Sequence, residues 1–187
     1  MNRLLNILGF AGSLRNNSYN RALLRVSADL VPNDTKLDIF DLEGIPPFNQ
    51  DLEKSMPEKV KEFKAKIKSA DAILIVTPEY NYSIPGALKN AIDWASRPSG
   101  ENSFDGKPVA VMSASTGMLG GARAQYHLRQ VCITLNMYPL NRPEVFVTFA
   151  NQKFDEKGNL TDEKTKEFIK GLLEALVTWT KKLKAVT

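Results

Sequence analysis

Hydroxyl and guanidinium side chains lie close together in a short segment near the start of the chain. The segment follows an apolar run that ends at Phe10, and it contains Ser13, Arg15 and Ser18. A helical pattern of apolar residues begins just after it, at Ala22. Because the first N–H groups of a helix have no intrahelical partner, an anion is favoured at such a point. The segment therefore predicts an anion site, with an ordinary turn capped by Ser18 as the alternative.

Residues 9–20 lack the fingerprints of the common nucleotide sites. They contain neither G-x-G-x-x-G, which holds a dinucleotide pyrophosphate, nor G-x-x-x-x-G-K-[ST], which holds a triphosphate. A dinucleotide pyrophosphate site and a triphosphate site are therefore disfavoured.

Two further loops have compositions suited to a planar ligand. Residues 77–86 contain Tyr80 and Tyr82, whose rings are flat and apolar, and Asn81, whose amide can both donate and accept hydrogen bonds. Residues 113–121 include Gly117 and the pair Gly120 and Gly121, so a ring can approach their backbone closely.

The pattern of apolar residues predicts how these loops are positioned. Strands are expected at residues 4–10, 36–40, 70–76, 108–112 and 144–148, and residues 41–55 are expected to form a loop. Helices are expected to end near residues 31–34, to span 57–69 and 85–95, to end near 135, and to run from about 161 to 184. This alternation predicts a flavodoxin-like α/β fold, a doubly wound five-stranded parallel sheet of order 2-1-3-4-5 with helices on both faces. The loops after strands one, three and four should then converge.

Composition narrows the function further. The 187 residues fit a single domain, 1–187, and the net charge of +4 has no basic arm or aromatic platform typical of nucleic-acid binding. One cysteine, Cys132, and one histidine, His127, exclude an internal disulfide, a zinc cluster and a hydrolase triad. Cys132 is expected in the core, and His127 in a structural or surface role. No stretch is long enough to span a membrane or act as a signal peptide, so we expect a cytoplasmic protein.

The segments Gly12–Asn20 and Pro78–Trp94 resemble the two signature segments of the NADPH-dependent FMN reductase family, which includes chromate, quinone and azo-dye reductases. The resemblance implies that the FMN phosphate is held by Ser13, Arg15, Ser18 and Asn20, with Tyr19 beside them. It also implies that the isoalloxazine ring is lined by Pro78, Glu79, Tyr80, Asn81 and Ser83, and closed on its other side by Ser115, Thr116 and Gly117. A homodimer or homotetramer with flavin sites near the subunit interface is expected on the same grounds.

The implied reaction needs no catalytic residue and no metal, since the flavin itself accepts and passes on hydride. NADPH or NADH would reduce FMN, and quinones, free flavins, azo compounds or oxidised metal ions such as chromate would take the electrons. Backbone amides of the second and third loops are expected to bind the pyrimidine edge of the ring. Arg15 has three candidate partners: the FMN phosphate, the NADPH phosphate and a carboxylate of a neighbouring subunit.

Two alternatives use the same fold. A flavodoxin-type electron carrier would bind FMN without turning over a substrate, but such carriers are usually acidic and this chain is basic. A phosphoacceptor signalling domain needs carboxylates in the loops after strands one and four, which contain none. The sequence leaves open the electron acceptor, the choice between NADPH and NADH, and the choice between dimer and tetramer.

Overall fold

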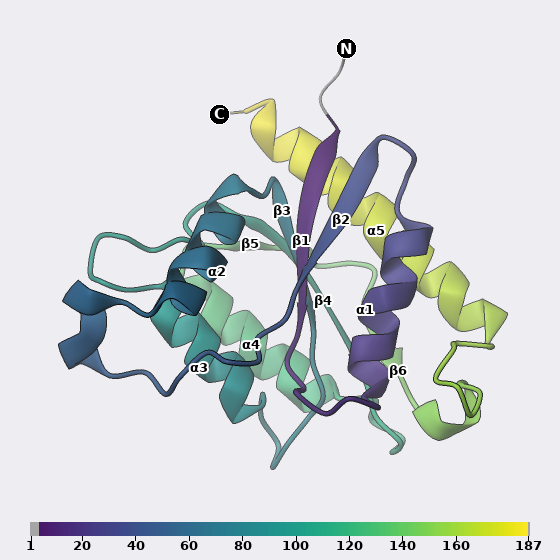
Figure 1. Ribbon diagram of the computed structural model, residues 1–187. Coiled ribbons are helices and arrows are strands. Elements are labelled where there is room, and N and C mark those ends of the chain that lie inside the picture. The colour runs from purple at the N-terminus through teal and green to yellow at the C-terminus, as the bar shows by residue number, and fades with distance from the viewer. Residues whose placement is uncertain (1–3, 187) are drawn as a thin grey trace.

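The computed structural model describes residues 4–186, which form a parallel sheet between two layers of helices (Figure 1). The strands are β1 (Leu5–Ala11), β2 (Thr35–Phe40), β3 (Ala72–Val76), β4 (Pro108–Ala114), β5 (Tyr138–Pro139) and β6 (Val145–Val147). The α-helices are α1 (Tyr19–Leu30), α2 (Glu58–Ser69), α3 (Gly86–Ala95), α4 (Ala122–Thr134) and α5 (Glu163–Lys184). Two short 3-10 helices, η1 (Gln50–Ser55) and η2 (Ala150–Gln152), complete the elements of the described residues.

The strand order is β2-β1-β3-β4-β5, with every pairing parallel, as predicted. The far edge differs from the prediction, because two short strands occupy the fifth position. β5 pairs with Pro108 and Val109 at the start of β4, and β6 pairs with residues 112–114 at its end. Pro139, at the end of β5, and Pro143, beyond it, have no N–H to donate to a strand ladder, which disfavours one continuous edge strand between these points. The sheet therefore has six strands where the sequence predicted five.

The two faces of the sheet are covered by different helices. One apolar cluster packs β-strand side chains against α2, α3 and α4, and the other packs them against α1 and α5. Figure 1 shows these groups on opposite sides of the sheet, with α1 and α5 at the right. All five residues of β3 are buried, which is why its sequence is a continuous apolar run.

Side chains cap the starts of α1 and α5 by accepting hydrogen bonds from backbone N–H groups. The Ser18 hydroxyl accepts from the N–H groups of Asn20 and Arg21 at the start of α1, and the Asp162 carboxylate accepts from Thr165 at the start of α5. Pro57 directly precedes α2. The expected loop of residues 41–55 is wrong in part, because its last six residues form η1, whose start is capped by Asn49.

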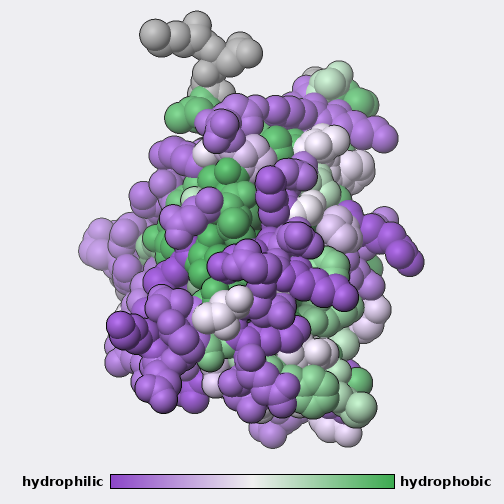
Figure 2. Space-filling view, turned by 90° about the vertical axis from the view of Figure 1, so that its right-hand side faces the viewer, coloured by the Kyte–Doolittle hydropathy of each residue, from purple (hydrophilic) through white to green (hydrophobic). Residues whose placement is uncertain are grey.

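The interior and the surface of the described residues address further expectations from the sequence. Cys132 is fully buried, as expected, and burial raises the pKa of its thiol to about 12. Among residues 4–186, no helix is both long and apolar enough to cross a membrane. On the side that displays α1 and α5, polar side chains surround smaller apolar areas (Figure 2). The sequence predicts a single domain over residues 1–187. Residues 1–3 and 187 lie outside the described residues.

Candidate functional site

Three loops meet at the carboxyl edge of the sheet because the strand pairing continues into each of them. The N–H of Gly12 donates to Val76 (2.8 Å), that of Thr77 to Met112 (3.0 Å), and that of Ser115 to Val147 (3.0 Å). Between the loops lies a cavity of about 430 Å³. It is lined by Ser13, Arg15, Ser18, Tyr19, Asn20, Pro78, Glu79, Tyr80, Ala114, Ser115 and Thr116. The structure therefore brings together all of the predicted residues of the first loop and most of those of the other two.

The first loop has unpaired donors at or next to this cavity, whose lining includes Tyr19. In the part of the chain that the structure describes, the backbone N–H groups of Asn16, Asn17 and Tyr19 have no hydrogen-bond acceptor. These groups lie where α1 begins, and the helix dipole adds partial positive charge there. The Arg15 guanidinium lies 6.0 Å from the ring centroid of Tyr19 and donates to the Asn17 carbonyl (2.8 Å). This end of the cavity is suited to an anion.

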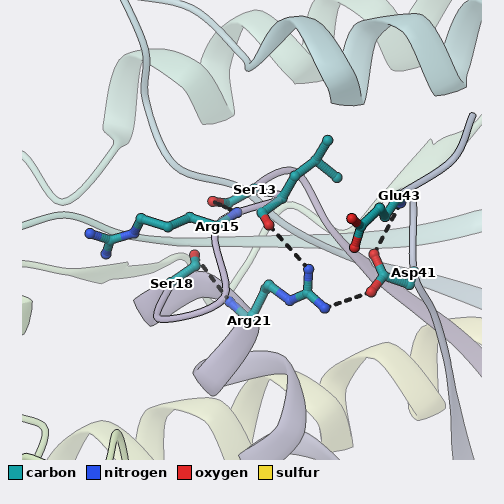
Figure 3. A network of polar contacts seen from close by, with 7 residues as sticks. Ser13, Arg15, Ser18, Arg21, Asp41 and Glu43 are labelled. Carbon is teal, nitrogen blue, oxygen red and sulfur yellow. Dashed lines mark hydrogen bonds and ion pairs between the residues drawn. The ribbon is translucent and has the colours of Figure 1, made fainter. Parts of the chain in front are cut away.

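A second arginine supports the loop from behind. Arg21 forms an ion pair with Asp41 (2.5 Å), and the Asp41 carboxylate also accepts from the N–H of Glu43 (3.1 Å). Figure 3 shows the Arg21 side chain directed to Asp41, while the Arg15 side chain extends in another direction. Since Arg21 is already paired, Arg15 is the arginine left to meet an anion in the cavity. This role of Arg21 was not predicted from the sequence, although Arg21 follows Ser18 by only three residues.

Asn20 joins the first loop to the third. Its Nδ2 donates to the carbonyl of Ala114 (3.0 Å), and its Oδ1 accepts from the N–H of the same residue (2.9 Å). Both atoms of the amide are thus used by the last residue of β4, and the side chain is buried. A second link crosses the cavity, where the hydroxyls of Ser13 and Tyr80 lie 3.4 Å apart. The three loops are consequently coupled before any ligand binds.

The second loop contains a tight hairpin. Tyr80 and Ser83 exchange two backbone hydrogen bonds of 2.9 Å, and the two residues between them, Asn81 and Tyr82, have φ values of 49° and 66°. A two-residue turn with positive φ at both positions is the primed type that matches strand twist. Asn81 adopts it readily, whereas for Tyr82 it costs on the order of 1 kcal/mol. This turn places Asn81 and Ser83 outside the lining of the cavity.

Glu79 and Ser83 attach this hairpin to α4. The Glu79 carboxylate accepts from Nε of Arg123 (2.5 Å) and from the backbone N–H groups of Arg123 (3.1 Å) and Ala124 (3.4 Å). Ser83 Oγ lies 2.7 Å from Nδ1 of His127, which is exposed on the same helix. His127 therefore has a structural contact at the surface, in agreement with its expected role. Arg123 was missed by the sequence analysis, because no pattern linked it to a loop 44 residues earlier.

The glycines of the third loop serve mainly to form the turn. Gly120 (φ 57°) and Gly121 (φ 88°) are in the left-handed region, and an added Cβ would lie 3.0 Å from Phe146 or 2.7 Å from Ser113. A side chain at either position would therefore collide with its neighbours. Gly117 is different, because a Cβ there would make only an ordinary 3.4 Å contact with Ser115.

Gly117 lines a second cavity of about 340 Å³, together with Glu79, Ser115, Met118, Leu119, Gly121 and Arg123. This cavity shares Glu79 and Ser115 with the first one, so the two adjoin. Among the described residues, no group of three or more histidine, cysteine, aspartate or glutamate side chains is placed to hold a metal ion. The open donors at the start of α1 and the flat surfaces of Pro78 and Tyr80 fit a phosphate at one end and a ring at the other.

Comparison with known proteins agrees with this geometry. The sequence profile of the family described as NADPH-dependent FMN reductase matches residues 5–152. The chain belongs to the NADPH-dependent FMN reductase family. It is 48% identical over 181 residues to an NAD(P)H-dependent FMN reductase of Pseudomonas aeruginosa, covering 96% of this chain and 97% of the relative.

Other members of the family are similar over the same length. A 2-hydroxy-1,4-benzoquinone reductase of a Burkholderia species is 42% identical, with 94% of this chain and 96% of the relative covered. Among solved structures, the flavoenzyme NAD(P)H:(acceptor) oxidoreductase FerB of Paracoccus denitrificans superimposes with a TM-score of 0.88 at 38% identity. That match covers 95% of this chain and 98% of FerB, and it confirms the predicted flavodoxin-like fold.

The link through Asn20 can be tested by stability. Replacing Asn20 by alanine leaves the N–H and the carbonyl of Ala114 without their partner in a buried place, so we expect the free energy of unfolding to fall by about 1–3 kcal/mol. Urea denaturation measures the change. Asn17→Ala is the matched control, because Asn17 is exposed and only its backbone carbonyl is used. Equal stability of the two variants would contradict the linking role.

Proposed function

We propose that this chain is an FMN-containing reductase, which takes hydride from NADPH or NADH and passes electrons to small-molecule acceptors, in the first place quinones. The observation that carries the proposal is the cavity at the carboxyl edge, with unpaired N–H donors at the start of α1 and the Pro78–Tyr80 segment beside them. Support for the reaction comes from relatives named FMN reductase and quinone reductase at 40–48% identity.

The phosphate of FMN is assigned to the first loop. Free N–H groups and the Arg15 guanidinium supply donors, and Ser13 and Ser18 supply hydroxyls. The Ser18 hydroxyl accepts from the helix and keeps its own proton for the phosphate. Tyr19 lies beside this end of the cavity, and Asn20 contributes by holding α1 against β4.

The ring is assigned to the second and third loops. Pro78, Tyr80, Ser115 and Thr116 line the cavity directly, and Gly117 leaves room beside them. The family resemblance also places Asn81 and Ser83 next to the ring, and we keep them in this proposal. Both belong to the hairpin that positions Tyr80. Because the hairpin and the loops are held by several hydrogen bonds, their amides have fixed directions, and such preorganised donors stabilise negative charge on a bound ring.

Bound FMN supplies the hydride chemistry, and the protein binds it, orients it and adjusts its electrostatic surroundings. Residues lining the two cavities include no histidine and no cysteine, and the one carboxylate, Glu79, is already paired with Arg123. A cleft without specific acid, base or metal groups favours a broad range of electron acceptors. We therefore include free flavins, azo compounds and oxidised metal ions such as chromate among the proposed acceptors, in addition to quinones. The flavodoxin-type carrier is less supported, since the relatives are named as reductases.

We also propose that the protein is a homodimer or homotetramer. Exposed apolar side chains support this: Met118 at 72% exposure and Tyr82 at 71% lie on loops of the candidate site, and Tyr126 and Ile133, the latter at 76%, are exposed along α4. Covering such side chains removes apolar surface from water, at about 25 cal/mol for each Å². The cytoplasmic location, and the absence of nucleic-acid and membrane partners, stay predictions of the sequence.

The reaction is tested by anaerobic stopped-flow spectroscopy of the FMN-loaded protein. We expect NADPH or NADH to bleach the yellow absorption of the flavin, and 1,4-benzoquinone added in a second mix to restore it. A flavin that stays oxidised with both nucleotides would contradict the reductase and favour the carrier. A flavin that is bleached but not reoxidised by benzoquinone would remove quinones from the proposal.

The assignment of Arg15 predicts a difference between two flavins. Arg15→Ala should weaken FMN binding roughly tenfold, because a charge-assisted contact to the phosphate is lost, and should leave riboflavin binding unchanged. Fluorescence titration measures both affinities. Arg25→Ala is the control, an exposed arginine on α1 that lies outside the cavity. If the variant bound FMN with unchanged affinity but bound NADPH more weakly, Arg15 would be assigned to the nicotinamide nucleotide and not to the FMN phosphate.

The apolar surface on α4 predicts where subunits meet. Ile133→Lys should shift the protein to a smaller assembly in light scattering after size exclusion, because a charge would be placed in the interface. Thr178→Lys, on the exposed face of α5, is the control and should leave the assembly unchanged. A wild-type protein that is monomeric at all concentrations would contradict the proposed assembly.

A further inference from the structure

Glu79 lines the cavity, but both oxygens of its carboxylate are already used. Its side chain is only 10% exposed, and both oxygens are occupied: Oε1 by Nε of Arg123 at 2.5 Å, and Oε2 by the N–H groups of Arg123 and Ala124. A carboxylate with three donors from one helix start has little capacity left for a ligand. The Glu79 carboxylate is thus poorly suited to bind a flavin directly.

Arg123 is held from a second side. Its guanidinium carbon lies 3.6 Å from the centroid of the Tyr82 ring, within the range of a cation–π contact. Tyr82 itself stands in the left-handed region of the hairpin, where a tyrosine needs support from its surroundings. One arginine therefore contacts the residue before the hairpin and a residue within its turn, and fixes both to α4.

The charged side chains of Glu79 and Arg123 also lie at the same cavity. Both side chains line the second cavity, beside Ser115 and Gly117, and no other charged residue lines it. As a pair they add no net charge to that cavity. Removal of either one would leave the other uncompensated next to the place assigned to the ring.

We propose that Glu79 and Arg123 form a neutral clamp, which positions the 78–83 hairpin on α4 and sets the electrostatic balance beside the flavin ring. The Glu79 side chain is then a positioning group that acts through Arg123, next to the ring that Glu79 lines according to the family resemblance. The inference rests on the proposed function, because it requires FMN to bind with its ring at the second and third loops.

The two partners should have opposite effects on the flavin. Glu79→Gln leaves the positive charge of Arg123 alone, which stabilises the more negative reduced ring and raises the affinity for reduced relative to oxidised FMN. Arg123→Gln leaves the negative charge of Glu79 and lowers the same ratio. A residue that served only to maintain the fold would shift the ratio in the same direction in both variants. Opposite signs are therefore diagnostic of the clamp.

The experiment measures the reduction potential of bound FMN in wild type, Glu79→Gln and Arg123→Gln, with the affinities for oxidised FMN and riboflavin measured alongside. We expect the reduced-to-oxidised affinity ratio to rise at least threefold in Glu79→Gln and to fall at least threefold in Arg123→Gln. In each variant, the affinity for oxidised FMN and the affinity for riboflavin should fall by the same factor, because the residues assigned to the phosphate are unchanged. The conservative variant Arg123→Lys should return the ratio towards the wild-type value.

An exposed ion pair outside the site provides the matched controls. Lys89 and Asp93 lie 2.7 Å apart on α3, so Lys89→Gln and Asp93→Asn change the same charges without changing the ratio. Equal or absent shifts in the Glu79 and Arg123 variants, with FMN bound normally by wild type, would overturn the clamp and leave the proposed function intact. Wild-type protein that binds no FMN would instead overturn the proposed function.

Discussion

The direction of the sheet is the constraint on which the candidate site depends. Because β1, β3 and β4 run parallel, the loops that follow them leave the sheet at the same edge, and continued backbone pairing between Gly12, Thr77 and Ser115 and their neighbouring strands holds them together. None of the three loops could form the cavity alone. The helices on the two faces contribute by fixing the strands, and α1 and α4 additionally begin at the site.

Charge at the site is arranged in two different ways. At the first loop Arg21 is neutralised by Asp41, whereas Arg15 and the start of α1 remain to meet an anion. At the second loop the positive and negative charges of Arg123 and Glu79 compensate each other. The cleft is thus positive where a phosphate is expected and balanced where a ring is expected. This difference agrees with a ligand that has a charged end and a flat, weakly polar end.

The sequence predicted the features that follow from local pattern and failed where distant residues interact. Continuous apolar runs and cap residues located β3, α1 and α5, and the alternation of elements was sufficient for the strand order. The split of the fifth strand was missed, although Pro139 and Pro143 were visible signals. The glycines of the third loop were interpreted as room for a ligand, but Gly120 and Gly121 are required by the turn itself. The Glu79–Arg123 pair joins residues far apart in the sequence, so no local sequence pattern predicts it.

A crystal structure of the protein grown with FMN would show whether one mononucleotide binds across the three loops. We expect the phosphate at residues 13–19, within hydrogen-bond reach of the free N–H groups of Asn16, Asn17 and Tyr19. We expect the ring between Pro78–Tyr80 and Ser115–Gly117, with the Glu79–Arg123 pair intact. FMN bound elsewhere on the molecule, or with its phosphate at the second or third loop, would show that the three loops do not form the proposed mononucleotide site.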